Sequence, residues 1–265
     1  MNRIQAFEFN ERNECPEFIR DGIVEILGKG IRWSKYFNNS IQAFVQFARK
    51  VDTTTFLDLC SGSGEPAALF IEALLSQGNT QFKFVLSDLF PKIHSMNNVA
   101  KQFSEQIQVI TEPVDATNVK KEYDQAARTI INAFHHFPPE VAKDILKDCV
   151  KKSRGIFIIE SFPRSVLKYF SIIPYLAVSY LINPFITQKD RALKLFFSFA
   201  IPVIPVLGLW DGFISSCRIH SKEELFEMVD EWQSVYAWDY QEISFFPFGR
   251  AVIFSGVPKK ISQAK

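Results

Sequence analysis

The feature that most constrains the fold is a regular alternation of short apolar runs with segments of helical spacing, beginning near residue 53. The first five runs are separated by helical segments, as in a parallel α/β sheet. Only a short turn, Pro247-Phe248-Gly249, separates the last two, which predicts an antiparallel hairpin. The runs are 55–60, 82–87, 107–110, 128–132, 155–160, 238–246 and 250–256. We therefore predict an α/β fold with a doubly wound, seven-stranded, mostly parallel sheet that ends in an antiparallel hairpin.

Two regions lie outside this alternation. Residues 2–50 carry apolar side chains at helical spacing and are expected to form a helical cap over the ligand cleft. Residues 162–214 form an apolar insertion with helical character, which ends before a helix near Ser221. A chain of 265 residues suits one domain. We expect this domain to comprise a helical cap (1–50), a ligand-binding half (51–161), the insertion (162–214) and a C-terminal helix with the hairpin (215–265).

Charge and cysteine content exclude several classes of function. The chain has 30 Lys and Arg against 29 Asp and Glu, so it lacks the concentrated positive field that a nucleic-acid partner requires. Its cysteines form no Cys-x-x-Cys pair, so we expect neither a disulfide framework nor a metal site. The N-terminus lacks the apolar stretch of a signal peptide. These features favour a reduced, cytoplasmic setting, and the oligomeric state stays open. The cysteines are Cys15, Cys60, Cys149 and Cys217.

The strongest motif is Phe56-Leu57-Asp58-Leu59-Cys60-Ser61-Gly62-Ser63-Gly64-Glu65-Pro66-Ala67, an apolar strand that passes through a tight glycine turn into a helix. Gly62 and Gly64 let the backbone approach a ligand closely and leave helix-terminal amides free to donate. Gly62-x-Gly64-x-x-Ala67 also matches the fingerprint of nicotinamide dinucleotide sites. Asp58 favours a cationic ligand over a pyrophosphate, because it places a carboxylate on the first strand.

Two further acidic residues follow the next two strands. Asp88 closes the second strand before Leu89, a position from which a carboxylate can accept hydrogen bonds from both ribose hydroxyls. Asp115 follows the third strand, between Val114 and Ala116. The alternatives are that Asp88 caps the following helix and that Asp115 belongs to a turn.

This arrangement resembles the class I S-adenosylmethionine (SAM)-dependent methyltransferases, in which an acidic residue precedes Gly-x-Gly after the first strand. The resemblance implies SAM as cofactor, with Asp58 near the methionine amino group and Gly62 and Gly64 beneath the methionine and ribose. It also implies that Asp115 binds the adenine amino group, with Val114 or Ala116 against the ring. The cofactor-binding residues that we expect are Asp58, Cys60, Gly62, Gly64, Asp88, Leu89, Asp115, Ala116 and Asn132.

The fourth run ends in Asn132-Ala133-Phe134-His135-His136-Phe137, which is similar to an Asn-x-x-His-His segment of many small-molecule methyltransferases. The carboxyl end of such a strand is where open α/β sheets bind ligands. A histidine there could deprotonate an acceptor hydroxyl or amine, because its ordinary pKa lies near neutrality. One of the two could instead cap a helix. His135 and His136 are therefore the candidate catalytic residues.

Four residues are candidates for substrate binding. Glu160 and Arg164 follow the fifth run, where they either bind a polar substrate group or pair with each other. Trp210 and Asp211, with Arg218 shortly after them, precede the last helix and could line the same opening. The segments Asp-Leu-Cys-Ser-Gly, Phe-His-His-Phe and Leu-Trp-Asp-Gly together resemble a group of uncharacterised bacterial class I methyltransferases. That resemblance spans most of the chain and does not identify the acceptor.

The insertion contains two stretches without a charged residue, 169–186 and 195–210, on either side of a polar segment, 187–191. Each approaches the ~20 apolar residues of a membrane span, although prolines interrupt both. The helices could form a lid over a hydrophobic substrate, lie at a bilayer interface or span the membrane. They could also complete the core or form a dimer interface. Peripheral membrane contact through 166–214 is thus one expectation among several.

The predicted function is transfer of a methyl group from SAM to a small, apolar or lipid-like acceptor. One alternative is an NAD-dependent oxidoreductase, which would share the glycine turn; the reversed last strand argues against it. The other is a non-catalytic, methyltransferase-like binding protein at the membrane, since a fold does not fix a function.

Overall fold

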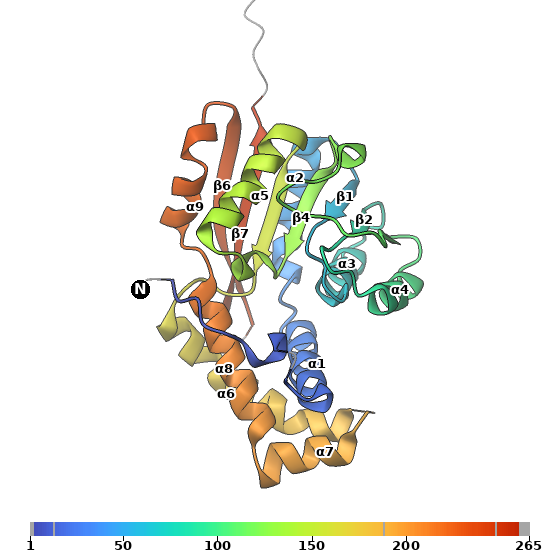
Figure 1. The fold of residues 1–265 in the computed structure, drawn as a ribbon, viewed down its shortest axis with the longest axis vertical. Helices are drawn as coiled ribbons and strands as arrows, with labels where there is room; N and C mark the ends of the chain where they lie inside the picture. Colours follow the sequence, from blue (N-terminus) through green and yellow to red (C-terminus); the bar gives the residue numbers. More distant parts are fainter. Residues whose placement is uncertain (1–2, 13, 188, 247, 260–265) are drawn as a thin grey trace, which may run out of the picture.

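The computed structural model describes residues 3–12, 14–187, 189–246 and 248–259. Within them, seven strands form one sheet in the order β3-β2-β1-β4-β5-β7-β6 (Figure 1). The first five strands are parallel, and β7 is antiparallel to both β5 and β6. The strands are β1 (Thr55–Asp58), β2 (Lys83–Leu86), β3 (Ile107–Val109), β4 (Ala127–Ile131), β5 (Ile156–Glu160), β6 (Tyr236–Phe245) and β7 (Gly249–Pro258). The predicted mostly parallel sheet with its C-terminal hairpin is confirmed.

The centre of the sheet explains why several strands read as continuous apolar runs. Every residue of β4 and of β5 is buried, because helices cover both faces. The chain order changes direction between β1 and β4, which are hydrogen-bonded neighbours. Such a switch point leaves a crevice at the carboxyl ends of the strands. The loops that follow β1 and β4 therefore meet where a ligand site is expected.

Five helices cover the two faces of the sheet. One face packs against α2 (Ile41–Val51), α3 (Glu65–Ser76) and α4 (Ile93–Gln102), and the other against α5 (Pro139–Lys152) and α9 (Lys222–Met228). Figure 1 shows α5 in front of the sheet and α2 behind it. Short 3₁₀ segments are η1 (Phe9–Glu11), η2 (Asn38–Ser40), η3 (Lys121–Tyr123), η4 (Phe134–His136) and η6 (Asp230–Trp232).

Phe44 of α2 lies at the centre of an aromatic core. Its ring centroid is 4.8 Å from that of Phe56 in β1, 5.1 Å from Phe70 in α3 and 5.3 Å from Phe157 in β5. These rings come from one helix, two strands and a second helix, so the cluster ties the face of the sheet together. Aromatic pairs at such distances stabilise beyond the area that they bury.

The remaining helices form a helical lobe beyond the carboxyl edge of the sheet, which extends downwards in Figure 1. It consists of α1 (Glu17–Trp33), α6 (Val166–Ile186), α7 (Arg191–Leu195), the π-helical turn η5 (Phe196–Ala200) and α8 (Val203–Arg218). Ile23 of α1, Ile172 of α6 and Ile204 of α8 share a separate buried core. The lobe thus joins the N-terminal residues to the apolar insertion.

The residues predicted as a helical cap divide between different places. Asn2 lies outside the described residues, and residues 3–8 form no helix before η1 begins at Phe9. Helix α1 belongs to the lobe, whereas α2 packs on the face of the sheet through Phe44 and Phe47. The last helix of the insertion continues to Arg218, past the predicted boundary at residue 214.

Candidate functional site

The turn after β1 has the backbone conformation that its glycines allow. Gly62 and Gly64 have φ angles of +58° and +82°, in the left-handed region where a side chain is disfavoured. A Cβ on Gly64 would also lie 3.0 Å from Leu86 Cδ1, so this residue packs against β2. Gly64 is the N-cap of α3 and does not line the cavity described below.

Asp58 supports this turn from beneath. Its Oδ2 accepts a hydrogen bond from the Ser61 hydroxyl (2.6 Å), and its Oδ1 accepts one from the Thr129 hydroxyl (2.7 Å). The side chain is buried, and burial raises its pKa to about 7 against these two hydrogen bonds. Asp58 lines neither of the two cavities described below. The structure therefore places Asp58 as a support of the loop, and its predicted contact with the methionine amino group stays a prediction.

Asp88 links the second strand to the glycine turn. Its Oδ2 accepts a hydrogen bond from the backbone N–H of Gly62 (2.8 Å), and its Oδ1 accepts one from Phe90 (2.9 Å). These contacts hold the carboxylate beside the glycine turn at the end of β2. Asp88 does not cap the following helix α4, whose N-cap is Lys92 and receives no side-chain hydrogen bond. It orders the local backbone and lines the cavity described below.

A cavity of about 510 Å³, here called the strand-end cavity, lies over the carboxyl ends of the parallel strands. It is lined by residues that follow β1, β2, β3 and β4 and by parts of α5. Of the expected cofactor residues, the structure brings together Cys60, Gly62, Asp88, Leu89, Asp115, Ala116 and Asn132. His136 also lines it. Loops far apart in the sequence thus converge on one space.

Asp115 lies in a turn and in the cavity wall at once. Its Oδ1 accepts hydrogen bonds from the backbone N–H (2.8 Å) and the hydroxyl (2.7 Å) of Thr117. Val114 and Ala116, its neighbours, also line the cavity and are themselves buried. An acidic side chain between two small apolar walls suits a flat ring that carries an amino group.

The strand-end cavity carries a negative electrostatic field. The pKa of the Cys60 thiol is raised by burial and by the nearby charges of Asp88, Asp58 and Asp115. Of these three acidic residues, Asp88 and Asp115 line the cavity itself. Such a field favours a ligand with cationic groups and disfavours a pyrophosphate at this end of the cavity.

A second cavity of about 230 Å³, here called the histidine cavity, adjoins the first. The two share Ser63, Pro66, Asn10, Asn132 and His136 in their walls. Its outer wall is apolar and comes from the lobe, through Val24, Leu27 and Ile31 of α1. Its inner wall is polar and includes His135, Glu160 and Glu8.

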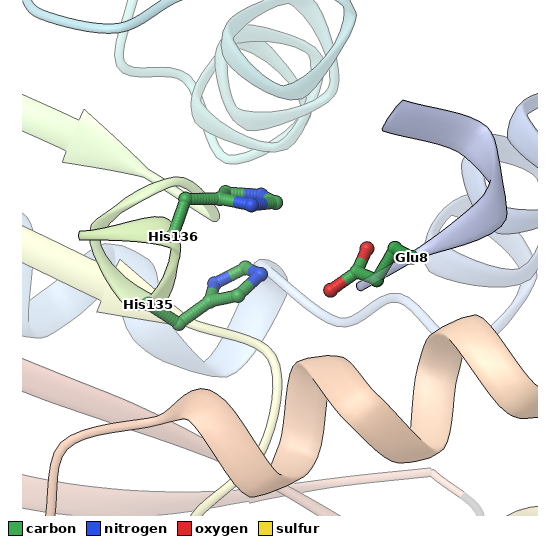
Figure 2. Close-up of side chains that lie close together, drawn as sticks. All are labelled: Glu8, His135 and His136. Atoms are coloured by element: carbon green, nitrogen blue, oxygen red, sulfur yellow. The ribbon is translucent and has the colours of Figure 1, made fainter. Parts of the chain in front are cut away.

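His135 is oriented by Glu160 at the end of β5. Its Nδ1 lies 2.6 Å from Glu160 Oε2, and its backbone N–H donates to Oε1 (3.0 Å). Burial would raise the pKa of Glu160, but the charge and hydrogen bonds of His135 outweigh it and lower that pKa. A proton on Nδ1 leaves Nε2 with a free lone pair. Figure 2 shows the ring of His135 extending towards Glu8.

His136 belongs to a separate ionic group with the N-terminal segment. Its Nδ1 lies 2.6 Å from Glu11 Oε1, and Arg218 Nη1 lies 2.9 Å from both Glu11 Oε1 and Glu8 Oε1. The pKa of Glu8 is raised by burial, whereas that of Glu11 is lowered, because His136 and Arg218 outweigh its desolvation. Residues 8–11 are thereby fastened over the two histidines.

Glu8, His135 and His136 place one ligand atom each within 4.8 Å of one another, a spacing that could hold a metal ion (Figure 2). The sequence led us to expect no metal. Arg218 already provides a positive charge 2.9 Å from Glu8 Oε1 and 3.2 Å from His136 Nδ1. A guanidinium there opposes a second cation by charge repulsion. We therefore assign the three residues to the polar wall of the histidine cavity.

The expected substrate residues are distributed unevenly. Glu160 and Asp211 line the histidine cavity, and the carboxylate of Asp211 accepts hydrogen bonds from the backbone N–H groups of Phe9 (2.6 Å) and Asn10 (3.0 Å). Arg164 and Trp210 line neither cavity. Arg164 pairs with Glu224 (2.8 Å) and so does not pair with Glu160, as had been one expectation.

Trp210 donates from its indole N–H to the carbonyl oxygen of Phe7 (3.2 Å). Like Asp211, it holds the N-terminal segment against α8. Sequence reasoning missed Glu8, Asn10 and Glu11, which reach the site from that segment. Their acidic or amide side chains match no spacing motif, and no pattern in the sequence could have indicated their partners.

Comparisons with known proteins found matches among solved structures but none by sequence. No family model matches the chain, and the search of curated proteins found no match. Among solved structures, it is similar to the plantazolicin methyltransferase BpumL in complex with S-adenosylhomocysteine (SAH), with a TM-score of 0.53 and 11% identity over 95% of this chain and 93% of that one. It is also similar to the mitomycin 7-O-methyltransferase MmcR, with a TM-score of 0.50 and 13% identity over 95% of this chain and 61% of that one.

The chain spans 50% of the length of PhzM, a pyocyanin biosynthetic protein that it matches with a TM-score of 0.45 and 12% identity over 76% of this chain. At these identities the likeness concerns the fold alone. That fold is the one of the class I methyltransferases, as the order and directions of the strands also indicate.

Proposed function

We propose that this protein is a SAM-dependent methyltransferase that acts on a small, largely apolar molecule with a hydroxyl or amino group. The observation that carries the proposal is the convergence of Asp88, Asp115 and the Gly62 turn on one cavity that adjoins a second, histidine-lined cavity. Two adjoining spaces suit a reaction between a cofactor and an acceptor. A nicotinamide enzyme would also need two, but the carboxylates of Asp88 and Asp115 in the wall of the strand-end cavity do not suit a pyrophosphate.

The residues of the strand-end cavity fit the parts of SAM. Asp88 is placed to accept hydrogen bonds from ribose hydroxyls, and Asp115 to accept one from an adenine amino group. The positive end of the α3 dipole, beside Ser63 and Pro66, suits a carboxylate. The negative field near Cys60 suits an ammonium or sulfonium group. When bound, SAM supplies an electrophilic methyl group.

The chain itself positions and deprotonates the acceptor. Val24, Leu27 and Ile31 hold the apolar body of the acceptor and exclude water. His135 accepts the proton of its hydroxyl or amino group at Nε2, while Glu160 fixes the ring through Nδ1 and stabilises the imidazolium that forms. Asn132 lies in the walls of both cavities, and its Oδ1 accepts hydrogen bonds from Ser161 (2.9 Å) and Tyr36 (3.2 Å), which hold it at their junction.

Calorimetric titration with SAH tests the cofactor. We expect wild-type protein to bind SAH and Asp88→Ala to bind it roughly 10- to 100-fold more weakly, because hydrogen bonds to a charged acceptor are lost. Asp144→Ala, an exposed carboxylate on α5, is the matched control and should bind like the wild type. Titration with NAD⁺ tests the oxidoreductase alternative. Heat with NAD⁺ and none with SAH would contradict the proposal.

A further inference from the structure

The outward face of α6 is an apolar stripe that runs the length of the helix. It consists of Leu167, Phe170, Val178, Leu181, Ile182 and Phe185, each between 41% and 81% exposed. They recur at intervals of about one or two turns, with exposed Pro174 in the gap, so they share one side of the helix. The opposite side packs into the lobe through Ile172 and Tyr180. A surface helix of a soluble domain normally carries charged residues on this outer side.

The stripe continues onto the tip of the lobe. The ring of Phe185 lies 5.7 Å from that of Phe199 in η5, and Phe199 is 51% exposed. Phe196 of the same turn and Ile201, which follows it, are exposed to a similar degree. Exposed apolar side chains therefore extend from the end of α6 onto the tip of the lobe, which lies at the lower end of Figure 1. Exposed patches of this kind mark interaction sites.

Length and hydropathy separate α6 from the core helix of a soluble protein. Within the part of the chain that the structure describes, Leu167–Ile186 is long and apolar enough to cross a membrane, yet only 33% of it is buried. The units Arg191–Ala200 and Val203–Arg218 together pass the same test, with a bend of 79° between them. A core helix with this composition would be mostly covered by protein.

Basic residues lie at both ends of the stripe. Lys168 stands at its start, where it is partly exposed and pairs with Glu242 (2.9 Å). Lys189 and Arg191 follow its end and are exposed; Lys189 pairs with Glu17 (2.9 Å) and Asp21 (2.7 Å), and Asp190 lies between the two basic residues. No acidic residue lies within α6. An apolar surface with basic side chains at its ends matches a bilayer, whose acyl region meets the apolar side chains. Arg191 is placed to meet its phosphates directly, and Lys168 and Lys189 would exchange their carboxylate partners for phosphates.

We propose that the α6 stripe and the adjoining tip of the lobe dock onto the surface of an anionic lipid bilayer. The helix lies in the interface and does not cross it, because its other side is held in the lobe core by α1 and α8. The same lobe provides the apolar wall of the histidine cavity, so docking would bring that cavity close to lipid-soluble acceptors. The docking itself does not depend on the proposed methyl transfer.

Vesicle flotation of the full chain tests this docking. We expect binding to vesicles of phosphatidylcholine and phosphatidylglycerol mixed at roughly 7:3, and weaker binding to phosphatidylcholine alone. Replacing three stripe residues, Phe170→Ser, Leu181→Ser and Phe185→Ser, should reduce the bound fraction on the order of tenfold or more, since apolar burial drives interfacial binding. Val235→Ser is the matched control, because Val235 is 52% exposed just before β6, away from the lobe. It should bind like the wild type.

A second measurement keeps the test valid if the triple variant folds poorly. An environment-sensitive fluorophore attached at Leu181→Cys, in a Cys60→Ser background, should shift its emission to the blue when vesicles are added. The same label at Val235→Cys should not. Absence of flotation by the wild type, or no shift at residue 181, would overturn the proposal. A dimer in light scattering that the stripe variant dissociates, without vesicle binding, would assign the surface to a second copy of the chain.

Discussion

Phe44 and Phe185 show how differently the two halves of this molecule use the same residue type. Phe44 is fully buried and contacts rings from both strands and helices of the sheet region. Phe185 is 55% exposed at the end of α6, where it contacts Phe199 at the tip of the lobe. The 27 phenylalanines of the chain therefore have at least two structural roles. Near the sheet they stabilise the fold, and on the lobe they form a surface.

The largest effect on stability should separate these two residues. Phe44→Ala removes a ring from a packed core and should lower the free energy of unfolding by about 3–5 kcal/mol. Phe185→Ala removes a ring that is already half in water, and should lower it by no more than about 1 kcal/mol. Urea denaturation followed by circular dichroism measures both. Similar losses in the two variants would show that the lobe surface is packed more tightly than the structure has it.

The pH dependence of stability should reveal the buried carboxylate beneath the glycine turn. The pKa of Asp58 is raised by burial from 3.8 to about 7 in the folded protein. Its protonated form is therefore favoured by folding, and its contribution to stability is present below pH ~4 and is lost as the pH rises through 7. As the pH rises from 5 to 8, the urea midpoint of unfolding should fall less steeply in Asp58→Asn than in the wild type. The exposed Asp144→Asn is the control, and an unchanged slope in Asp58→Asn would contradict the assignment.

The catalytic role proposed for His135 can be tested separately from cofactor binding. His135→Ala should lower the rate of methyl transfer on the order of 100-fold, because an oriented general base is lost. SAH affinity should change little, since His135 lines the histidine cavity and does not line the strand-end cavity. His94→Ala, which changes an exposed side chain of α4, is the control and should leave the rate unchanged. The measurement is a single-turnover assay with an acceptor that the wild type methylates; equal rates in both variants would exclude His135 as the base.

The sheet and its acidic strand ends were predictable, because both follow from short-range patterns. Parallel strands bring their carboxyl ends to one edge, so Asp88 and Asp115 converge without knowledge of any contact. The role of Asp58 was harder to predict. A residue near a strand end faces either the ligand or the interior, and here the hydroxyls of Ser61 and Thr129 hold it inside.

The long-range contacts of the lobe could not be predicted from short-range sequence patterns. Glu11 pairs with Arg218 across 207 residues, and Arg164 finds Glu224 instead of the nearby Glu160. Long-range ion pairs depend on how helices pack, and no local spacing encodes them. The apolar composition of the insertion indicated its helices, but it did not distinguish which side of α6 would face outwards.

The smallest expected effect concerns two glycines that test how closely the lobe helices approach. A Cβ on Gly208 of α8 would collide with the ring and hydroxyl of Tyr180 in α6, so Gly208→Ala should destabilise the protein by about 1–3 kcal/mol. Gly30 of α1 has nothing within 4 Å of an added Cβ, and Gly30→Ala should stabilise by about 0.5–1 kcal/mol, because alanine loses less backbone freedom in a helix. Thermal melts of both variants give the comparison.

Because the lobe has its own core, the Gly208→Ala variant should lose the α1 wall of the histidine cavity before the sheet unfolds. Hydrogen exchange measured separately for the lobe and the sheet can resolve the two steps. Destabilisation by both substitutions, with uniform exchange across the chain, would mean that sheet and lobe unfold as one unit.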